Sequence, residues 1–257
     1  MDKSGLDIRI EDFVAVIELN NPPSNLLSGN ILRELEAVLD RLETDPACKV
    51  LTITGHGTVF TPGMNLNEIR ETASHEQLAG LSSLGHQVFN RIETYPKPII
   101  AAVNGLCLGG GTELILACHM RVASQAASIA LPEIKVGILP GFGGTQRLPR
   151  LINPAKAAEM ILTGASVGGE EAFRLGLVNH VVPGDKLMAE TMKLAQNLAA
   201  KSRFALKAGL KTIYAGLELN LEQGLKLEVE QVTGLWHEPD MHEGLNAFFA
   251  KRKANYL

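Results

Sequence analysis

Two glutamates and two glycine turns are the residues of this chain whose types and spacing could do chemistry. Residues 104–118, NGLCLGGGTELILAC, run three consecutive glycines into Glu113 on an otherwise apolar stretch, where a charge is costly to bury. Glu133 follows twenty residues later, directly behind a proline in another apolar segment. Two carboxyl groups can divide acid and base work when burial and mutual repulsion keep one of them protonated.

Each glutamate alone also has a simpler explanation. Glu113 can merely complement the positive end of a helix dipole, and Glu133 can be a solvated, ion-paired loop residue. The glycines of residues 109–111 leave backbone N–H groups open to a ligand at a helix start, and a second glycine turn, FTPGMNLNEI at residues 60–69, also opens a helix. Two such donors aimed at one thioester oxygen would stabilise an enolate, each by about 3 to 4 kcal/mol.

Composition narrows the class of protein. The 257 residues are 46% hydrophobic and 20% charged, which fits a globular chain with a sizeable core. The net charge of −4 provides no basic field for nucleic acid or an anionic membrane. We expect neither a signal peptide nor a membrane span, because no long uncharged apolar run occurs. Three cysteines without a C-x-x-C pair argue against a disulfide framework or a zinc site, so we expect a reducing, cytoplasmic location.

Several motifs are incomplete. GLCLGGGT lacks the lysine of a P-loop, and GFGGTQ lacks the last glycine of the dinucleotide fingerprint. GASVG matches the serine-hydrolase elbow but follows a helical pattern where a strand is required. His237 and His242 are five residues apart and would diverge on a helix, so they predict no metal site.

The candidate residues must be positioned by alternating strands and helices. Short β-branched runs bounded by Gly, Pro or Asn predict strands over residues 14–20, 49–55 and 98–105. Apolar residues at i, i+3 and i+4 behind Ser28 predict an amphipathic helix between the first two strands. Asn153 caps a further predicted helix that begins with a proline.

After residue 182 the pattern is almost wholly helical. We predict an α/β core with the active site over residues 1–194 and a helical C-terminal region over residues 195–257. This tail carries more apolar side chains than one thin appendage can hide, which predicts packing between subunits. The apolar residues concerned are Leu210, Ile213, Leu217, Leu219, Leu221 and Leu225.

Five segments resemble the enoyl-CoA hydratase/isomerase, or crotonase, superfamily in order and spacing over nearly the whole chain. They are FTPGMNL, KPIIAAVNGLCLGGGTEL, LPEIKVGILPGFGGTQRLPR, LTGASVGGEEAFRLGLVNHVVP and GLNAFFAKRKANY. The resemblance implies an α/β fold, a crotonase-like spiral of ββα turns that forms two roughly perpendicular sheets. It also implies a C-terminal helical trimerisation region, so we expect a homotrimer or a homohexamer.

The resemblance also assigns roles within the site. The backbone N–H groups of Met64 and Gly110 would form an oxyanion hole for the thioester oxygen. Glu113 would act as base on water, and Glu133 would protonate C2 of the enoyl group. No metal and no separate cofactor is implied, since coenzyme A is part of the acyl-CoA substrate.

The C-terminal tail has two interpretations. Composition alone makes Lys251, Arg252 and Lys253 a solvated, charged terminus. In the family, a lysine matching Lys251 and an aromatic residue matching Phe248 lie at the CoA site of a neighbouring subunit. The resemblance therefore makes Lys251 and Phe248 candidate CoA-binding residues.

Four positions depart from the common family pattern. Asn65 and His119 replace aspartates, Met64 replaces a smaller alanine, and Ala130 replaces a glycine. The acyl group of the substrate therefore stays open. The favoured function is 2-enoyl-CoA hydration, and the alternatives are a Δ3-Δ2 isomerase, another acyl-CoA or acyl-carrier enzyme of the family, and a non-catalytic binding homologue.

Overall fold

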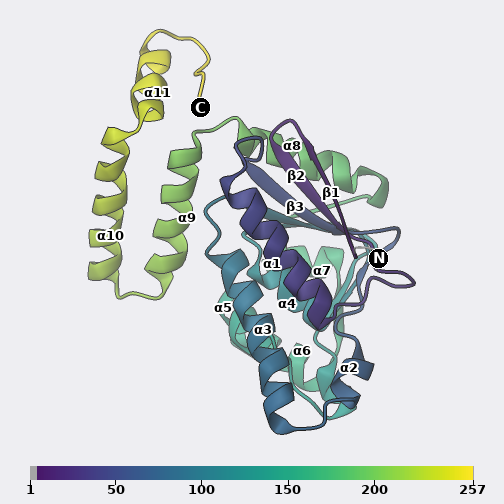
Figure 1. The fold of residues 1–257 in the computed structure, drawn as a ribbon. Coiled ribbons are helices and arrows are strands. Elements are labelled where there is room, and N and C mark those ends of the chain that lie inside the picture. The colour runs from purple at the N-terminus through teal and green to yellow at the C-terminus, as the bar shows by residue number, and fades with distance from the viewer. Residues whose placement is uncertain (1–4, 257) are drawn as a thin grey trace.

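The computed structural model describes residues 5–256 and contains two β-sheets surrounded by helices (Figure 1). The strand order of the first sheet is β1 (Leu6–Glu11), β2 (Val14–Leu19), β3 (Val50–Gly55), β5 (Ile99–Val103), β7 (Met120–Ser124) and β10 (His180–Val182). The strand order of the second sheet is β4 (Val59–Thr61), β6 (Leu106–Leu108), β8 (Ser128–Ala130) and β9 (Ser166–Gly168). All neighbouring strands are parallel except the β1–β2 and β8–β9 pairs.

The chain winds through both sheets once in each repeat. Strands β3, β5 and β7 enter the six-stranded sheet, and the next strands, β4, β6 and β8, enter the four-stranded sheet. Helices follow each pair: those after β4 and β6 return the chain to the first sheet, those after β8 lead to β9 in the second sheet, and one more helix then leads to β10. They are α2 (Leu66–Arg70), α3 (His75–Glu93), α4 (Gly110–Ala117), α5 (Gly144–Leu151), α6 (Pro154–Thr163) and α7 (Gly169–Arg174), with the 3-10 turn η1 (Glu133–Val136) before α5. The predicted spiral of ββα turns is confirmed.

Local sequence signals account for several of these elements. Helix α1 (Gly29–Thr44) begins after Ser28, whose Oγ accepts a hydrogen bond from the Ile31 N–H at 3.2 Å. Helix α6 begins with a proline after Asn153, whose side chain accepts from the Ala155 N–H at 2.9 Å. The predicted strands correspond to β2, β3 and β5. The short strand β6 between β5 and the glycine turn was not predicted.

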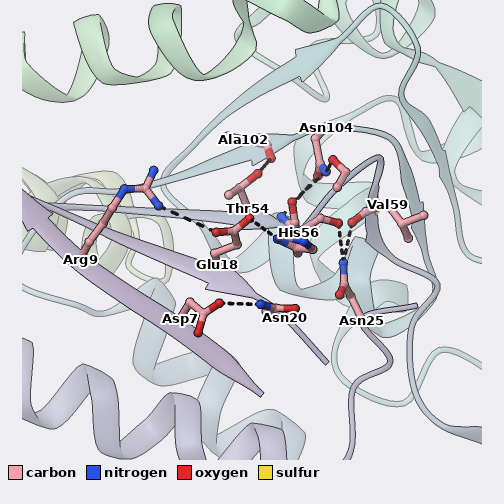
Figure 2. Close-up of polar contacts among 12 residues, drawn as sticks. Asp7, Arg9, Glu18, Asn20, Asn25, Thr54, His56, Val59, Ala102 and Asn104 are labelled. Carbon is pink, nitrogen blue, oxygen red and sulfur yellow. Dashed lines mark hydrogen bonds and ion pairs between the residues drawn. The ribbon is translucent and has the colours of Figure 1, made fainter. Parts of the chain in front are cut away.

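Two asparagine side chains fix the turn between β3 and β4 (Figure 2). Asn25 Nδ2 donates to the Val59 carbonyl at 2.8 Å. Asn104, at the end of β5, donates to the carbonyls of Gly55 and Gly57, both at 2.9 Å, and accepts from the Gly55 N–H. The Asn104 bonds tie the β3–β4 turn to the turn between β5 and β6, and the Asn25 bond holds the start of β4. The two strands that lead to the predicted N–H donors are therefore held side by side.

The main hydrophobic core lies between the sheets and helices α1, α3 and α4, and all eight residues of α4 are buried. A smaller core lies on the other face of the large sheet, beneath α8 (Leu187–Ala199). Leu194, where the predicted core ends, lies inside α8. The division into residues 1–194 and 195–257 stays a prediction.

The remaining helices extend away from the core (Figure 1). They are α9 (Arg203–Leu217), α10 (Leu221–Gly234) and α11 (Pro239–Phe249), and the 3-10 turns η2 (Gly184–Lys186) and η3 (Leu235–His237) precede α8 and α11. Helices α9 and α10 contain no buried residue, and α11 buries only Asp240 and Ala247. Among residues 5–256, no helix is both long enough and apolar enough to cross a membrane.

Candidate active site

The β4–β6 pairing brings Met64 and Gly110 together although they are distant in sequence. Gly63, which follows β4, lies so close to the end of β6 that a Cβ on it would be 2.7 Å from the Leu108 carbonyl oxygen and 3.2 Å from Gly110 N. A Cβ on Gly110 would in turn lie 3.6 Å from Met64 N. The two predicted oxyanion-hole nitrogens are therefore neighbours.

Both N–H groups are available to a ligand. The bridge between Leu27 and Met64 uses the residues on either side of Met64: the Leu27 N–H donates to the Gly63 carbonyl at 2.9 Å, and the Asn65 N–H donates to the Leu27 carbonyl at 2.8 Å. The Met64 N–H therefore points away from Leu27. Gly110 is the first residue of α4, so its N–H has no acceptor within the helix. Within residues 5–256, neither N–H donates a hydrogen bond.

Two of the three consecutive glycines, Gly109 and Gly111, cannot take a side chain without strain or overlap, and the third, Gly110, lies at the predicted oxyanion hole. Gly109 has φ +51°, and a Cβ there would lie 2.8 Å from Glu133 Oε1. A Cβ on Gly111 would overlap the Thr61 side chain at the end of β4. A Cβ on Gly110 would meet its neighbours at ordinary contact distances of 3.4 to 3.6 Å, so a methyl group fits there. Larger side chains would crowd the approach to the Gly110 N–H.

Glu113 lies in the first turn of α4 and is buried. Its Oε1 accepts hydrogen bonds from the Phe142 N–H at 2.7 Å and from the Gly144 N–H at 2.8 Å. Burial, the largest cause, raises the pKa of the Glu113 carboxyl to about 7, and the carboxyl of Glu133 acts in the same direction. The two N–H donors and the charge of Arg147 act against this rise.

Glu133 begins the turn η1, and its Oε1 lies close to Gly109 of the glycine turn. Its Oε2 is buried and makes no hydrogen bond with any described residue. Burial raises the pKa of the Glu133 carboxyl. A buried oxygen without a partner is costly in the ionised form, so this environment favours a proton on Glu133.

These groups line one cavity of about 910 Å³. Met64, Gly110, Glu113 and Glu133 all contribute to its wall. Most other lining side chains are apolar and come from α2, α3 and the segment after η1: Leu66, Ile69, Leu78, Leu81, Leu139 and Phe142. Within residues 5–256 no cluster of His, Cys, Asp or Glu could hold a metal ion. The arrangement offers two N–H donors and two carboxyls to one bound molecule.

The predicted CoA-binding residues lie elsewhere in the protomer. Phe248 is on α11 and is 76% exposed, and Lys251 follows that helix with an exposed side chain and φ +50°. Neither lines the cavity that contains Glu113 and Glu133. One protomer therefore brings together four of the six predicted site residues, and contacts of Lys251 and Phe248 with CoA stay a prediction.

Two departures from the family pattern have local explanations. Asn65 caps α2, because its side chain accepts a hydrogen bond from the Asn67 N–H at 3.1 Å. His119 is buried, accepts from the Ile99 N–H at 2.9 Å through Nδ1, and has Nε2 3.2 Å from the Glu93 carbonyl oxygen. Burial lowers the pKa of His119 to about 4, so the ring is neutral and supplies an acceptor for the Ile99 N–H.

The turn that binds Glu113 is a functional feature that was not predicted from the sequence. Phe142 and Gly144 donate to the carboxylate, and Arg147 holds the Phe142 carbonyl at 3.1 Å. Their segment, GFGGTQR, forms part of one of the five family-like segments and contains an incomplete nucleotide fingerprint, but neither pattern predicts its contact with Glu113. The sequence feature that indicates such a site is a glycine-rich turn at the start of a helix. It exposes N–H donors just as the turn at residues 109–111 does.

Comparison with known proteins shows the family. The model of the family "Enoyl-CoA hydratase/isomerase" matches residues 9–257. The chain belongs to this family.

Similar proteins align with this chain over nearly its whole length. A "Probable enoyl-CoA hydratase" of Bacillus subtilis is 41% identical over 254 residues, which are 98% of each chain. A "Crotonyl-CoA hydratase" of Syntrophomonas wolfei is 36% identical over 96% of this chain and 95% of its own. The crystal structure of an enoyl-CoA hydratase from Bacillus anthracis superposes with a TM-score of 0.94 at 36% identity and covers 98% of both chains. The predicted family and its fold are confirmed.

Proposed function

We propose that this protein is an enoyl-CoA hydratase that adds water across the C2=C3 double bond of a 2-enoyl-CoA thioester. The observation that carries the proposal is the convergence of Glu113 and Glu133 on one cavity beside the free N–H groups of Met64 and Gly110. A thioester oxygen held by those N–H groups would place C2 and C3 near both carboxyls. Relatives named as hydratases, at 36% and 41% identity, support the same reaction.

The two N–H donors act on the thioester oxygen. When water adds at C3, the electron pair of the double bond moves toward that oxygen and forms an enolate. Met64 N–H and Gly110 N–H stabilise this developing charge, and loss of one such donor typically costs about 10²- to 10³-fold in kcat. Because the oxyanion hole consists of backbone groups, the methionine at position 64 leaves its donor unchanged.

The carboxyls divide the proton transfers. Glu113 removes a proton from water as the oxygen bonds to C3, and Glu133 donates a proton to C2, so the product gains H and OH across the former double bond. A pKa of about 7 makes the Glu113 carboxyl an effective base near neutral pH. The unpartnered Oε2 of Glu133 supports its role as the protonated partner. The two groups titrate as a coupled pair, and the singly protonated form is the active one.

The acyl group enters a largely apolar part of the cavity. Leu66, Ile69, Leu78 and Leu81 line it, and this environment favours an apolar acyl chain over one that carries a distal charge. Such substrates arise in fatty-acid β-oxidation. All three cysteines are free and buried, which supports action in the reducing cytoplasm.

The functional unit is a homotrimer or a pair of trimers. Helices α9 and α10 have no buried residue and expose large apolar side chains, which supports their packing against other copies. The most exposed of these are Ile213, Leu217, Leu221 and Val229. In that assembly Lys251 and Phe248 would reach the CoA of a neighbouring subunit, which fits their position outside the cavity of their own protomer.

An absorbance assay tests the proposal. Wild-type protein should consume crotonyl-CoA and longer 2-enoyl-CoAs, measured as loss of the conjugated thioester absorbance. Glu113→Gln and Glu133→Gln should each fold and lose about 10²- to 10⁴-fold in kcat, since each removes one proton-transfer group. The exposed Glu71→Gln is the matched control and should keep full activity.

Two results would contradict the roles given to the glutamates. Turnover close to wild type in both active-site variants would remove them from the mechanism. If Glu133→Gln alone were inactive while Glu113→Gln still moved a double bond from C3 to C2, the protein would be an isomerase.

A further inference from the structure

The turn that binds Glu113 is itself held by one side chain. Arg147 Nη1 donates to the Phe142 carbonyl at 3.1 Å. That carbonyl belongs to the peptide group between Phe142 and Gly143. The peptide groups on either side of it carry the Phe142 and Gly144 N–H groups that donate to Glu113. Because the three peptide groups are consecutive, fixing the middle one restricts the direction of both donors.

Arg147 is fixed in turn from helix α3. Its Nε and Nη2 donate to Glu93 Oε2 at 3.1 and 2.8 Å, and Nη2 also donates to Asn90 Oδ1 at 2.5 Å. The Arg147 side chain is only 12% exposed, whereas that of Glu93 is 33% exposed, so the guanidinium is the better shielded half of this pair. A planar guanidinium with bonds at three nitrogens has little freedom left.

The turn is shaped to admit the guanidinium. Gly143 has φ +109°, and a Cβ built on it would overlap Arg147 Nη1. Any residue other than glycine at this position would therefore be strained and would displace the arginine. The atom that would be displaced is the Nη1 that donates to the Phe142 carbonyl, so the glycine is what allows this hydrogen bond.

We propose that Arg147, anchored by Glu93, is a positioning residue that aims the Phe142 and Gly144 N–H groups at Glu113 and so keeps this base ionised and oriented. The proposal rests on the hydratase function given above. Arg147 does not line the cavity of Glu113, so it acts through the turn and not on the substrate.

The charges around Glu113 determine in which direction the loss of Arg147 shifts the pKa of Glu113. Glu133 on η1 raises the pKa of Glu113, and Arg147 on α5 lowers it. On α3, Glu93 pairs with Arg147, and His86 Nδ1 lies 3.9 Å from the position of a Cβ on Gly143. Removing Arg147 takes away a positive charge and loosens two N–H donors, and both changes raise the pKa of Glu113. A base with a higher pKa is protonated at higher pH, so activity should be lost earlier as the pH falls.

The test is a pH–rate profile of Arg147→Gln with matched controls. We expect kcat to fall about 10-fold or more and the midpoint of the acid limb to move up by roughly one pH unit. Arg147→Lys keeps the positive charge but lacks the planar guanidinium with its several donors. Its kcat should therefore fall, while the midpoint of its acid limb should move less than that of Arg147→Gln. Arg150→Gln removes an arginine of the same helix whose hydrogen bonds within residues 5–256 go only to Gln146, and it should change neither quantity. Circular dichroism checks that each variant folds.

A second measurement separates this proposal from the hydratase function. In protein labelled with ¹³C at glutamate carboxyls, the Glu113 signal is assigned by its absence in Glu113→Gln and is titrated in wild type and Arg147→Gln. An inactive wild type would refute the hydratase function, and the titration would still test the positioning role.

An unmoved Glu113 midpoint in folded Arg147→Gln would overturn the positioning role, even with reduced kcat, because a purely structural arginine would leave that midpoint unchanged. If Arg147→Gln fails to fold, Glu93→Gln provides the same test. It leaves the arginine in place but weakens its anchor, so kcat should fall, and kcat equal to that of wild type would overturn the proposal.

Discussion

Replacing Glu113 with glutamine should stabilise the folded protein above neutral pH although it removes the catalytic base. Glutamine has nearly the shape of the protonated carboxyl and never ionises. In the folded chain the pKa of Glu113 is about 7, against its ordinary value of 4.5. The difference of about 2.5 pKa units, at about 1.4 kcal/mol for each unit, corresponds to roughly 3 to 4 kcal/mol. Glu113 is only 2% exposed, so solvent screening does not reduce this figure.

The pH dependence of this stability difference follows from proton binding to Glu113 in the folded and unfolded chains. Below about pH 4.5 the folded and unfolded chains both hold this proton, and the carboxyl has no cost relative to glutamine. Between pH 4.5 and about 7 the unfolded chain releases the proton first, so the wild-type free energy of unfolding falls as the pH rises. Above pH 7 the full cost of burying the carboxylate is present. The advantage of the glutamine variant should therefore grow from about 1 kcal/mol at pH 5 to about 3 kcal/mol at pH 8.

Urea unfolding at a fixed protein concentration measures this difference, since subunit association also contributes to stability. Wild type and Glu113→Gln are compared at several pH values from 5 to 8. Glu71→Gln, at an exposed helix end, serves as the control and should track wild type at every pH. The reasoning would be refuted if the free energies of unfolding of wild type and Glu113→Gln changed with pH in parallel, or if the variant were less stable than wild type at pH 8.

Three further predictions concern the oxyanion hole, the CoA contact and the assembly. Gly110→Val should fold but lose activity, because the branched side chain would crowd the backbone N–H of residue 110. Gly110→Ala should keep more activity than Gly110→Val, since a methyl group meets its neighbours at 3.4 Å or more. Lys251→Ala should raise KM for the thioester with little change in kcat, and the effect should shrink at high salt, where screening lengths fall below about 8 Å. Sedimentation should give a trimer or hexamer, and Leu225→Glu on α10 should weaken it.

Each of these has a contradicting result. Normal kcat in a folded Gly110→Val would remove that N–H from the oxyanion hole. Equal KM values at low salt would make Lys251 part of a solvated tail. A folded monomer at micromolar concentration would leave the apolar faces of α9 and α10 without the proposed partner.

The sequence alone determined the elements whose signals are local. Strands β2, β3 and β5 follow from β-branched runs with Gly, Pro or Asn at their ends, and the starts of α1 and α6 follow from the caps Ser28 and Asn153. Apolar surroundings and nearby glycine turns indicated Glu113 and Glu133, and resemblance to a family then assigned their roles. These signals lie within a few residues of what they predict, so no long-range contact is needed to recognise them.

Tertiary structure decided what depends on residues distant in sequence. Met64 becomes a neighbour of Gly110 only through the β4–β6 pairing, which the asparagines at the β3–β4 turn hold in place. The raised pKa of Glu113 results from burial, which exists only once the chain has folded around it. The link from Glu93 through Arg147 to the turn that binds Glu113 joins α3 to α5. No local pattern encodes such contacts, because their partners meet only when separate elements pack together.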